Sequence, residues 1–420
     1  MEFIGHGGKE IKERVLNSAE VKKKLKDLVT IEIKGRIARE CIGLGYGFFT
    51  PLEGFMGKAH IDAVCEKMTL ADEKTIWSLP IVFDISQQEI DERGIEVGDT
   101  ILLNFAGNPL AIMEVEEIFT YDKDKMARAT LGTTDIKHPG VRMIGRMRDR
   151  FISGKITLVN KPKFNPPFNR FFYTPIQLRK EFKKKDWLRI VAHQTKNVPH
   201  TGYEWLMKGT WFCANGDASV EKLQTGILVN CIIGSKRIGD YIDEAIVLTH
   251  QALNEGRYFR NDVHMVSITY WDMRYAGAKE AIFHAIVGIN LGCTHHIVDP
   301  DHGGVGDYYG SYDAQRIFDQ IPPGSLKIKP MCVLEWWYCP MCAEVTYSGL
   351  CGHTEERKKL SGTLIRSIIK DGGKSSRPIF RPQVFDVLME CAERYGFGSP
   401  FCTEEYLAKR QPVFTVPPLA

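Results

Sequence analysis

Between Thr174 and Pro330, short apolar runs alternate with stretches of helical spacing, and this alternation limits the fold more than any other feature of the chain. Such alternation predicts a doubly wound α/β domain, in which helices join parallel strands. Ligands of these sheets bind beyond the carboxyl ends of the strands, so binding residues are expected in the loops that follow them. The runs expected as strands are Ile190–Ala192, Ile227–Ile233, Val263–Ile268 and Thr294–Val298.

One strand–loop–helix unit in this region is especially informative. The apolar run Leu188–Ala192 is suited to a buried strand, and helical spacing resumes after Pro199. The polar loop between them would lead into a helix N-terminus, where unpaired backbone N–H groups attract phosphate. His200 and Tyr203 are three positions apart, so they share one face of the first helical turn.

Three segments after expected strands resemble motifs of the ATP sulfurylases (sulfate adenylyltransferases), relatives of the H-x-G-H nucleotidylyltransferases. Residues 194–204 read Q-T-K-N-V-P-H-T-G-Y-E, similar to the family's Q-T-R-N-x-x-H-x-x-H-E. Residues 273–277 read M-R-Y-A-G, as in the family, and residues 299–310 are close to its G-R-D-H-A-G-V-G-D-Y-Y-G. Residues 360–366 also resemble its I-S-G-T-x-I-R run, and the resemblance extends over most of the chain, from about Leu79 to Val384.

The resemblance implies transfer of the adenylyl group of ATP to sulfate, which gives adenosine 5′-phosphosulfate and pyrophosphate. Mg²⁺ would accompany ATP. The catalytic residues implied are Thr195, Lys196, Asn197, His200 and Tyr203. The substrate-binding residues implied are Gln194, Lys196, Arg274, Asp299, Pro300, Asp301, His302, Gly303 and Val333.

Three of these positions depart from the family pattern. Lys196 replaces an arginine and keeps its charge, but lysine lacks the planar fork that grips two oxyanion oxygens. Tyr203 replaces a histidine, and Pro300 replaces another arginine. Nearby histidines are candidates to compensate, namely His193, His295 and His296. Two alternatives therefore stay open: an adenylyltransferase for another oxyanion or acid, and a catalytically impaired paralogue that binds a nucleotide or a partner.

Residues 1–165 are expected to form a strand-rich N-terminal domain. Strand candidates are Leu79–Ile85, Val97–Leu103 and Leu110–Val115, with a turn at 106–109. The resemblance implies a PUA-like β-barrel here. PUA modules often bind RNA, but a net charge of +3 does not favour a nucleic-acid partner, and an architectural role is expected.

The remaining boundaries follow from proline content and cysteine spacing. Three prolines fall within Lys161–Pro167, which predicts a linker, so the catalytic domain is expected at 166–330 and a small C-terminal α/β domain at 331–420.

The C-terminal domain carries the pattern C-x2-C-x8-C-x-H, formed by Cys339, Cys342, Cys351 and His353. This spacing predicts a structural Zn²⁺ site, against a redox pair or unrelated buried thiols.

The whole chain has the features of a cytoplasmic protein. It shows neither a signal-peptide pattern nor an apolar run of about 20 residues, so no membrane partner is expected. The 11 cysteines are expected to be mostly reduced core residues, apart from the three in the metal pattern. A homodimer or larger homo-oligomer is expected, with the tail after Phe401 reaching a neighbouring subunit.

Overall fold

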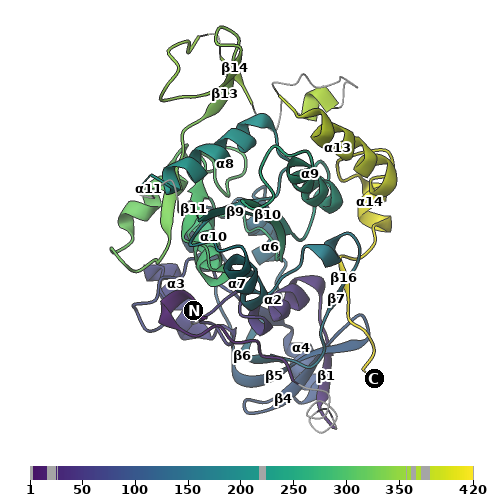
Figure 1. The fold of residues 1–420 in the computed structure, drawn as a ribbon. Coiled ribbons are helices and arrows are strands. Elements are labelled where there is room, and N and C mark those ends of the chain that lie inside the picture. Colours follow the sequence, from purple (N-terminus) through teal and green to yellow (C-terminus); the bar gives the residue numbers. More distant parts are fainter. Residues whose placement is uncertain are drawn as a thin grey trace.

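The computed structural model describes residues 3–16, 25, 27–216, 224–355, 357–360, 366–369 and 379–419. Two sheets organise them. In Figure 1 the N-terminal sheet (purple and blue) lies below the central sheet (teal and green), and the C-terminal helices (yellow) flank the central sheet. Most of the 360–366 run, residues 361–365, lies outside the described residues.

The N-terminal sheet contains six strands in the order β1-β4-β5-β6-β2, with β3 also on β6. β1 runs parallel to β4, and the other pairs are antiparallel. The predicted turn is confirmed, because Ala106 (φ 51°) and Gly107 (φ 76°) join β4 to β5. The strands are β1 (Val29–Glu32), β2 (Gly54–Phe55), β3 (Phe83–Ile85), β4 (Thr100–Phe105), β5 (Asn108–Phe119) and β6 (Arg150–Leu158).

Short helices surround this sheet. Their caps are visible in the sequence: Ser86 and Asp122 each accept a backbone N–H through their side chains at helix starts. The elements are η1 (His6–Gly8), α2 (Gly35–Gly45), α3 (Lys58–Lys67), α4 (Gln87–Arg93), α5 (Lys123–Leu131) and α6 (Pro139–Gly145).

The central sheet is entirely parallel, in the order β10-β9-β8-β11-β12. All four predicted strands are present, as β8 (Arg189–Thr195), β9 (Thr225–Ile233), β10 (His264–Tyr270) and β11 (His295–Val298). A fifth strand, β12 (Lys329–Cys332), crosses the boundary expected at residue 330. The strand order reverses between β8 and β11, and such a reversal opens a crevice for ligands at the carboxyl edge.

Helices cover both faces of the central sheet, as expected for a doubly wound fold. Figure 1 shows α8 (Thr201–Ala214) and α9 (Asp243–Glu255) above the sheet, with α7 (Pro175–Lys184) and α10 (Ala278–Leu291) below it, towards the N-terminal sheet. The short η2 (Phe168–Arg170), α11 (Asp313–Arg316) and η4 (Ile317–Gln320) complete this part. No helix in the described part of the chain is long and apolar enough to cross a bilayer.

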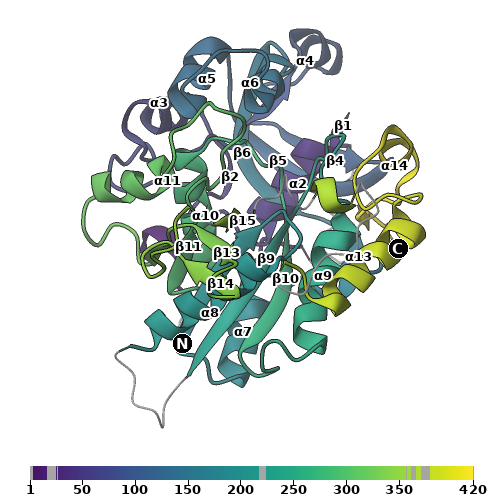
Figure 2. The ribbon, with the colours of Figure 1, turned by 90° about the horizontal axis from the view of Figure 1, so that it is seen from above.

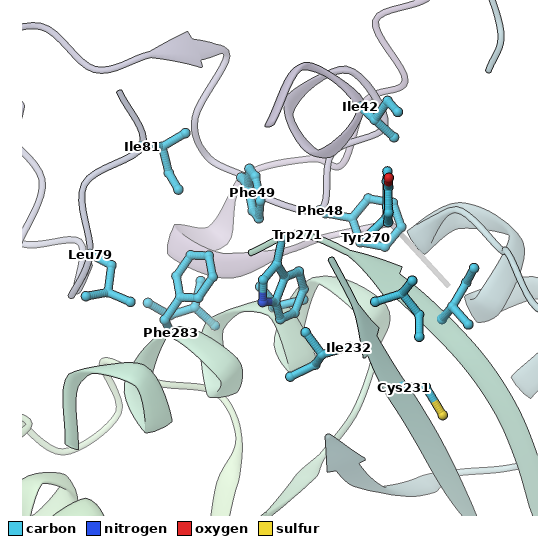
Figure 3. Close-up of a cluster of buried hydrophobic side chains, with 14 of the residues drawn as sticks. Ile42, Phe48, Phe49, Leu79, Ile81, Cys231, Ile232, Tyr270, Trp271 and Phe283 are labelled. Carbon is cyan, nitrogen blue, oxygen red and sulfur yellow. The ribbon is translucent and has the colours of Figure 1, made fainter. Parts of the chain in front are cut away.

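A shared aromatic core joins the two sheets. Figure 3 shows side chains of the N-terminal part, among them Phe49, facing Trp271 and Phe283 of the central part. The ring centroids of Phe49 and Phe283 are 5.6 Å apart, as are those of Trp271 and Phe283. Since all three side chains are buried, the loop after β10 is packed firmly against the N-terminal part.

The C-terminal part is spread over the surface of the central part. A three-stranded sheet of β13 (Trp336–Cys339), β14 (Glu344–Tyr347) and β15 (Lys358–Lys359) projects at the top of Figure 1. α13 (Pro382–Tyr395) packs on α9, as Figure 2 also shows, and α14 (Glu404–Lys409) follows.

The tail folds back onto its own chain. β16 (Phe414–Thr415) pairs with β7 (Lys163–Phe164), which lies inside the segment predicted as a linker. The rings of Phe414 and Phe105 stack at 5.2 Å. Phe414 of β16 is thus buried against its own chain, and contact of the tail with a neighbouring subunit stays a prediction.

Candidate active site and metal cluster

The loops after β8 and β11 line one cavity of about 480 Å³. Cavities of this size hold nucleotide-sized ligands. The cavity lies at the point where the strand order reverses, so the two motifs recognised in the sequence converge there. Predicted residues in its lining are Gln194, Thr195, Lys196, Asn197, His200, Tyr203, Asp299, Asp301, His302 and Gly303.

The loop after β8 is held by hydrogen bonds from its own polar side chains. The Gln194 amide nitrogen donates to the carbonyl oxygen of His284 at 2.5 Å, and Thr195 Oγ1 accepts the N–H of Asn197 at 3.1 Å. Asn197 Nδ2 donates to the hydroxyl of Tyr203 at 3.3 Å. The loop is thus preorganised before any ligand arrives.

His200 and Tyr203 stand together at the start of α8. His200 Nδ1 accepts the N–H of Gly202 at 3.1 Å, so His200 caps the helix and its Nε2 carries the proton. Burial lowers the pKa of His200 to about 3, and burial also raises the pKa of Tyr203. Their ring centroids are 4.3 Å apart. Both are therefore neutral hydrogen-bond donors near neutral pH.

Lys196 supplies positive charge to the cavity. Its Nζ lies 4.0 Å from the ring centroid of Tyr275, and burial lowers its pKa to about 8. Arg366 is the second cation in the lining, while Asp299 and Asp301 are its two carboxylates. The formal charge of the lining is therefore close to zero when its histidines are neutral.

The loop after β11 depends on a hydrogen-bonded histidine pair and on glycine. Burial opposes ionisation of Asp299, but His302, whose Nδ1 lies 3.2 Å from Asp299 Oδ1, outweighs it and lowers the pKa of that carboxyl. His302 Nε2 lies 2.8 Å from His284 Nδ1. A Cβ at Gly303 would stand 2.6 Å from the Cβ of Glu280, and φ there is +67°, so only glycine fits.

Three predicted substrate-binding residues lie outside the cavity lining. The Arg274 guanidinium donates to Glu40 Oε1 at 2.7 Å and to the carbonyl oxygen of Asp272 at 2.6 Å, in the interface between the two sheets. Val333 is buried and donates its N–H to Val298. Pro300 accepts a hydrogen bond from the N–H of Tyr312. Any role of these three in binding stays a prediction.

Of the three neighbouring histidines, only His193 lines the cavity. Burial lowers its pKa to about 4, so it adds no positive charge near neutral pH. His296 is fully buried and absent from the lining, and His295 contacts Thr294 at the amino end of β11. None of them replaces a missing cation.

Sequence reasoning missed several residues of the site. Tyr241 and Met273 line the cavity, as does Arg366, the last residue of the 360–366 run. The loop after β9, with Lys236 and Arg237, borders a narrow adjoining space. The position of this loop after a predicted strand was a usable signal, because every such loop meets the same sheet edge.

The predicted metal ligands form a compact cluster. The ligand atoms of Cys339, Cys342, Cys351 and His353 all lie within 4.8 Å of one another. The Sγ atoms of Cys342 and Cys351 are 3.8 Å apart, and His353 Nδ1 lies 3.4 Å from Cys342 Sγ. Cys339 ends β13, and Cys342 lies in the turn between β13 and β14. These four side chains could hold a metal ion.

Comparison with known proteins identifies both sheets. Residues 169–391 match the ATP-sulfurylase family model, and residues 3–161 match a PUA-like domain. A sulfate adenylyltransferase of Archaeoglobus fulgidus is 37% identical over 96% of this chain and 94% of its own length. One of Pyrococcus abyssi is 36% identical over 94% of this chain and 98% of its own.

A solved structure shares the fold at lower identity. It is described as a hexameric APS kinase from Thiobacillus denitrificans, and it matches with a TM-score of 0.70 and 18% identity over 92% of this chain and 68% of that chain. The family model and the archaeal relatives agree over nearly the whole length, and on that evidence the chain belongs to the ATP sulfurylase family.

Proposed function

We propose that the cavity between the loops after β8 and β11 carries the reaction of the family. A sulfate oxygen attacks the α-phosphorus of ATP, the bond from that phosphorus to the β-phosphate oxygen breaks, and adenosine 5′-phosphosulfate and pyrophosphate result. One observation carries this proposal: both family motifs line a single cavity of about 480 Å³. Positioning of the two anions there would supply much of the rate enhancement.

The chemistry asks for donors and cations around the α-phosphorus, where negative charge builds up. Lys196 is placed to neutralise oxyanion charge, since its ammonium is buried in the lining. The Nε2–H of His200 and the hydroxyl of Tyr203 would act as neutral donors from the lining of the same cavity. Gln194, Thr195 and Asn197 would hold the sulfate and phosphate oxygens in line.

Magnesium would accompany ATP and neutralise charge on the leaving pyrophosphate. The residues that fit it are Asp299 and Asp301, because carboxylate oxygens are the ligands that Mg²⁺ prefers. His302 keeps Asp299 ionised and oriented through the contact between its Nδ1 and Asp299 Oδ1 at 3.2 Å. Asp301 is the less strongly acidic of the two, since burial and the nearby Asp299 raise its pKa.

The second candidate function is adenylyl transfer to a different oxyanion. It is favoured by the near-neutral lining, in which Lys196 and Arg366 face two carboxylates. Lysine acts as a point charge and does not impose the two-pronged geometry of arginine, so the acceptor pocket is less selective for sulfate. A larger or less symmetrical oxyanion would fit such a pocket equally well.

Pyrophosphate release from ATP, measured with a panel of oxyanions, tests the proposal. Release with sulfate supports the first function, and release with another anion alone supports the second. If no anion gives pyrophosphate release, both functions are overturned, and the chain would be a paralogue that binds a ligand without catalysis. The Lys196→Ala variant is the matched control, because release that survives it does not come from this cavity.

We also infer that the four-residue cluster holds zinc in a structural role. Zinc–sulfur bonds of about 2.3 Å in a tetrahedron place ligand atoms roughly 3.8 Å apart. The separations of 3.4 Å to 3.8 Å between Cys342, Cys351 and His353 fit that geometry. Four protein ligands leave no position for a substrate, so the metal would stabilise the β13–β14 hairpin.

Two further inferences concern the setting of the enzyme. None of the 11 cysteines forms a disulfide, which suits the reducing cytoplasm and supports that location.

Exposed Trp205 and Phe212, the latter 74% exposed, line an apolar groove, and such surface supports a homodimer or larger homo-oligomer. Analytical ultracentrifugation tests the second point, and a monomer at micromolar concentration overturns it.

A further inference from the structure

A second cleft, of about 650 Å³, lies between the N-terminal sheet and the other half of the central sheet's carboxyl edge. Its walls are β1 and α2, the end of α6, and the loops after β9 and β10. The reaction cavity is formed mainly by the loops after β8 and β11, and among the described residues only Met273, in the loop after β10, lines both spaces.

The cleft is strongly cationic. Eight Lys and Arg side chains line it, against three Asp and Glu side chains. Five of the eight are within ion-pair distance of a carboxylate, including Arg36 with Asp84, and Arg39 with Asp272 at 2.6 Å. The other three, Lys34, Arg142 and Arg146, have no carboxylate within 4.0 Å in the described part of the chain.

A helix N-terminus adds to this charge. α2 begins at Gly35 in the cleft wall, and the side chain of its N-cap residue, Lys34, accepts no hydrogen bond. Its first turn contains no acidic residue. The positive end of an 11-residue helix therefore lies in the wall of the same cleft as the unpaired cations, without an acidic side chain in its own first turn.

Arg237 also has unused donor capacity. Its Nε is buried and lacks a hydrogen-bond partner among the described residues, although the Asp240 carboxylate lies 3.6 Å away. Arginine presents N–H groups in a fork that matches phosphate oxygens, and the side chain of Arg237, which is 38% exposed, lines the cleft. The cleft thus combines unpaired cations, a partly exposed arginine and a helix dipole.

We propose that this cleft is a second anion site, which binds a compact anion bearing at least two phosphate groups. The three unpaired cations carry more positive charge than a single sulfate or phosphate would neutralise, whereas the charge of a diphosphate matches them. Pyrophosphate is the anion of this class that the proposed reaction itself makes, and only this choice of ligand rests on the proposed function. A phosphorylated metabolite of the same chemistry is the other source.

Besides Met273, which lines both spaces, an aromatic ring connects the cleft to the reaction cavity. Tyr275 lines the cleft, and its ring centroid is 4.3 Å from Arg237 Cζ and 4.0 Å from Lys196 Nζ. An anion that pairs with Arg237 would draw it away from this ring, on which Lys196 of the reaction cavity rests. Binding of an anion in the cleft would therefore change the contact between Lys196 and the Tyr275 ring.

Calorimetric titration of the full-length protein with pyrophosphate tests the proposal. The protein is first saturated with a non-hydrolysable ATP analogue, so that the reaction cavity is filled. We expect one remaining pyrophosphate per chain, and about tenfold weaker or no binding in Arg142→Ala/Arg146→Ala, since two charge-assisted contacts are lost. Arg142→Lys/Arg146→Lys should recover part of the affinity. Arg128→Ala/Arg170→Ala, which removes two exposed arginines outside the cleft, should match the wild type.

The outcomes separate this proposal from the proposed function. Equal affinity in both alanine double variants, or no pyrophosphate bound beside the analogue, overturns the second site. If the chain shows no adenylyl transfer but the arginine-dependent binding persists, the proposed function fails and the second site stands. Slower turnover at high pyrophosphate with the analogue-free enzyme, abolished in Arg142→Ala/Arg146→Ala, identifies the product as the ligand. Unchanged turnover there, with binding intact, identifies a separate phosphorylated ligand.

Discussion

The ammonium group of Lys196 lies 4.0 Å from the centre of the Tyr275 ring. The ring face carries partial negative charge, so it stabilises a cation that burial would otherwise penalise. The backbone of Tyr275 has a φ of 60°, which is uncommon for residues other than glycine and asparagine. This backbone conformation accompanies the position of the ring against the lysine. An arginine stands at position 196 in the family pattern, so Lys196 is one of the three positions at which this chain departs from that pattern.

The pH dependence of turnover should report Lys196 directly. Burial lowers its pKa to about 8, so the side chain is charged below that pH and neutral above it. We expect kcat/KM, which reflects the free enzyme, to fall as pH rises through about 8. Lys196→Arg should remove this descending limb, because arginine stays protonated. A limb that persists in Lys196→Arg would assign the titration to another group.

Arg274 should prove structural. Its guanidinium is buried and bonded to Glu40, so Arg274→Ala leaves that carboxylate with only Arg36 as a partner. Breaking a buried pair costs about 3 kcal/mol, and we expect a lower thermal unfolding midpoint with the KM for ATP of the folded fraction unchanged. Glu40→Gln/Arg274→Met is the control, which should lose less stability. A large rise in the KM for ATP without loss of stability would instead indicate that Arg274 binds the substrate.

Sequence reasoning predicted the central sheet well, because buried parallel strands are continuous apolar runs and β8 to β11 are of this kind. It predicted that the loops at Gln194 and Asp299 meet, since both follow strands of one sheet. The sequence does not predict in which direction a loop side chain points. Arg274 lies in the loop after β10, as predicted, but its guanidinium points into the interface between the two sheets. Lys236 and Arg237 were missed because no motif marks them, although β9 before them was predicted.

The attachment of the C-terminal helix should depend on Glu204. This carboxylate, on α8, is fully buried and receives two hydrogen bonds from Arg381 at the start of α13, at 2.7 Å and 2.8 Å. Arg381→Ala should cost about 2 kcal/mol, less than a fully buried pair, because Lys208 remains bonded to Glu204. Hydrogen exchange should then speed up in α13 before the central sheet. Uniform exchange rates across both would contradict this attachment.

Removal of the metal should separate stability from catalysis. The cluster of Cys339, Cys342, Cys351 and His353 projects on the β13–β14 hairpin, and none of the four lines the reaction cavity. Elemental analysis should find one zinc per chain in the purified protein and none in Cys342→Ser/Cys351→Ser. We expect that variant to unfold at a lower temperature, because metal binding stabilises the fold that presents the ligands. Its turnover per folded molecule should stay within about twofold of wild type, since no ligand position is open to substrate.

Cys213→Ser, which alters an exposed cysteine outside the cluster, is the matched control and should keep both its zinc and its unfolding temperature. Loss of turnover in parallel with zinc in the still-folded protein would instead place the metal in the reaction.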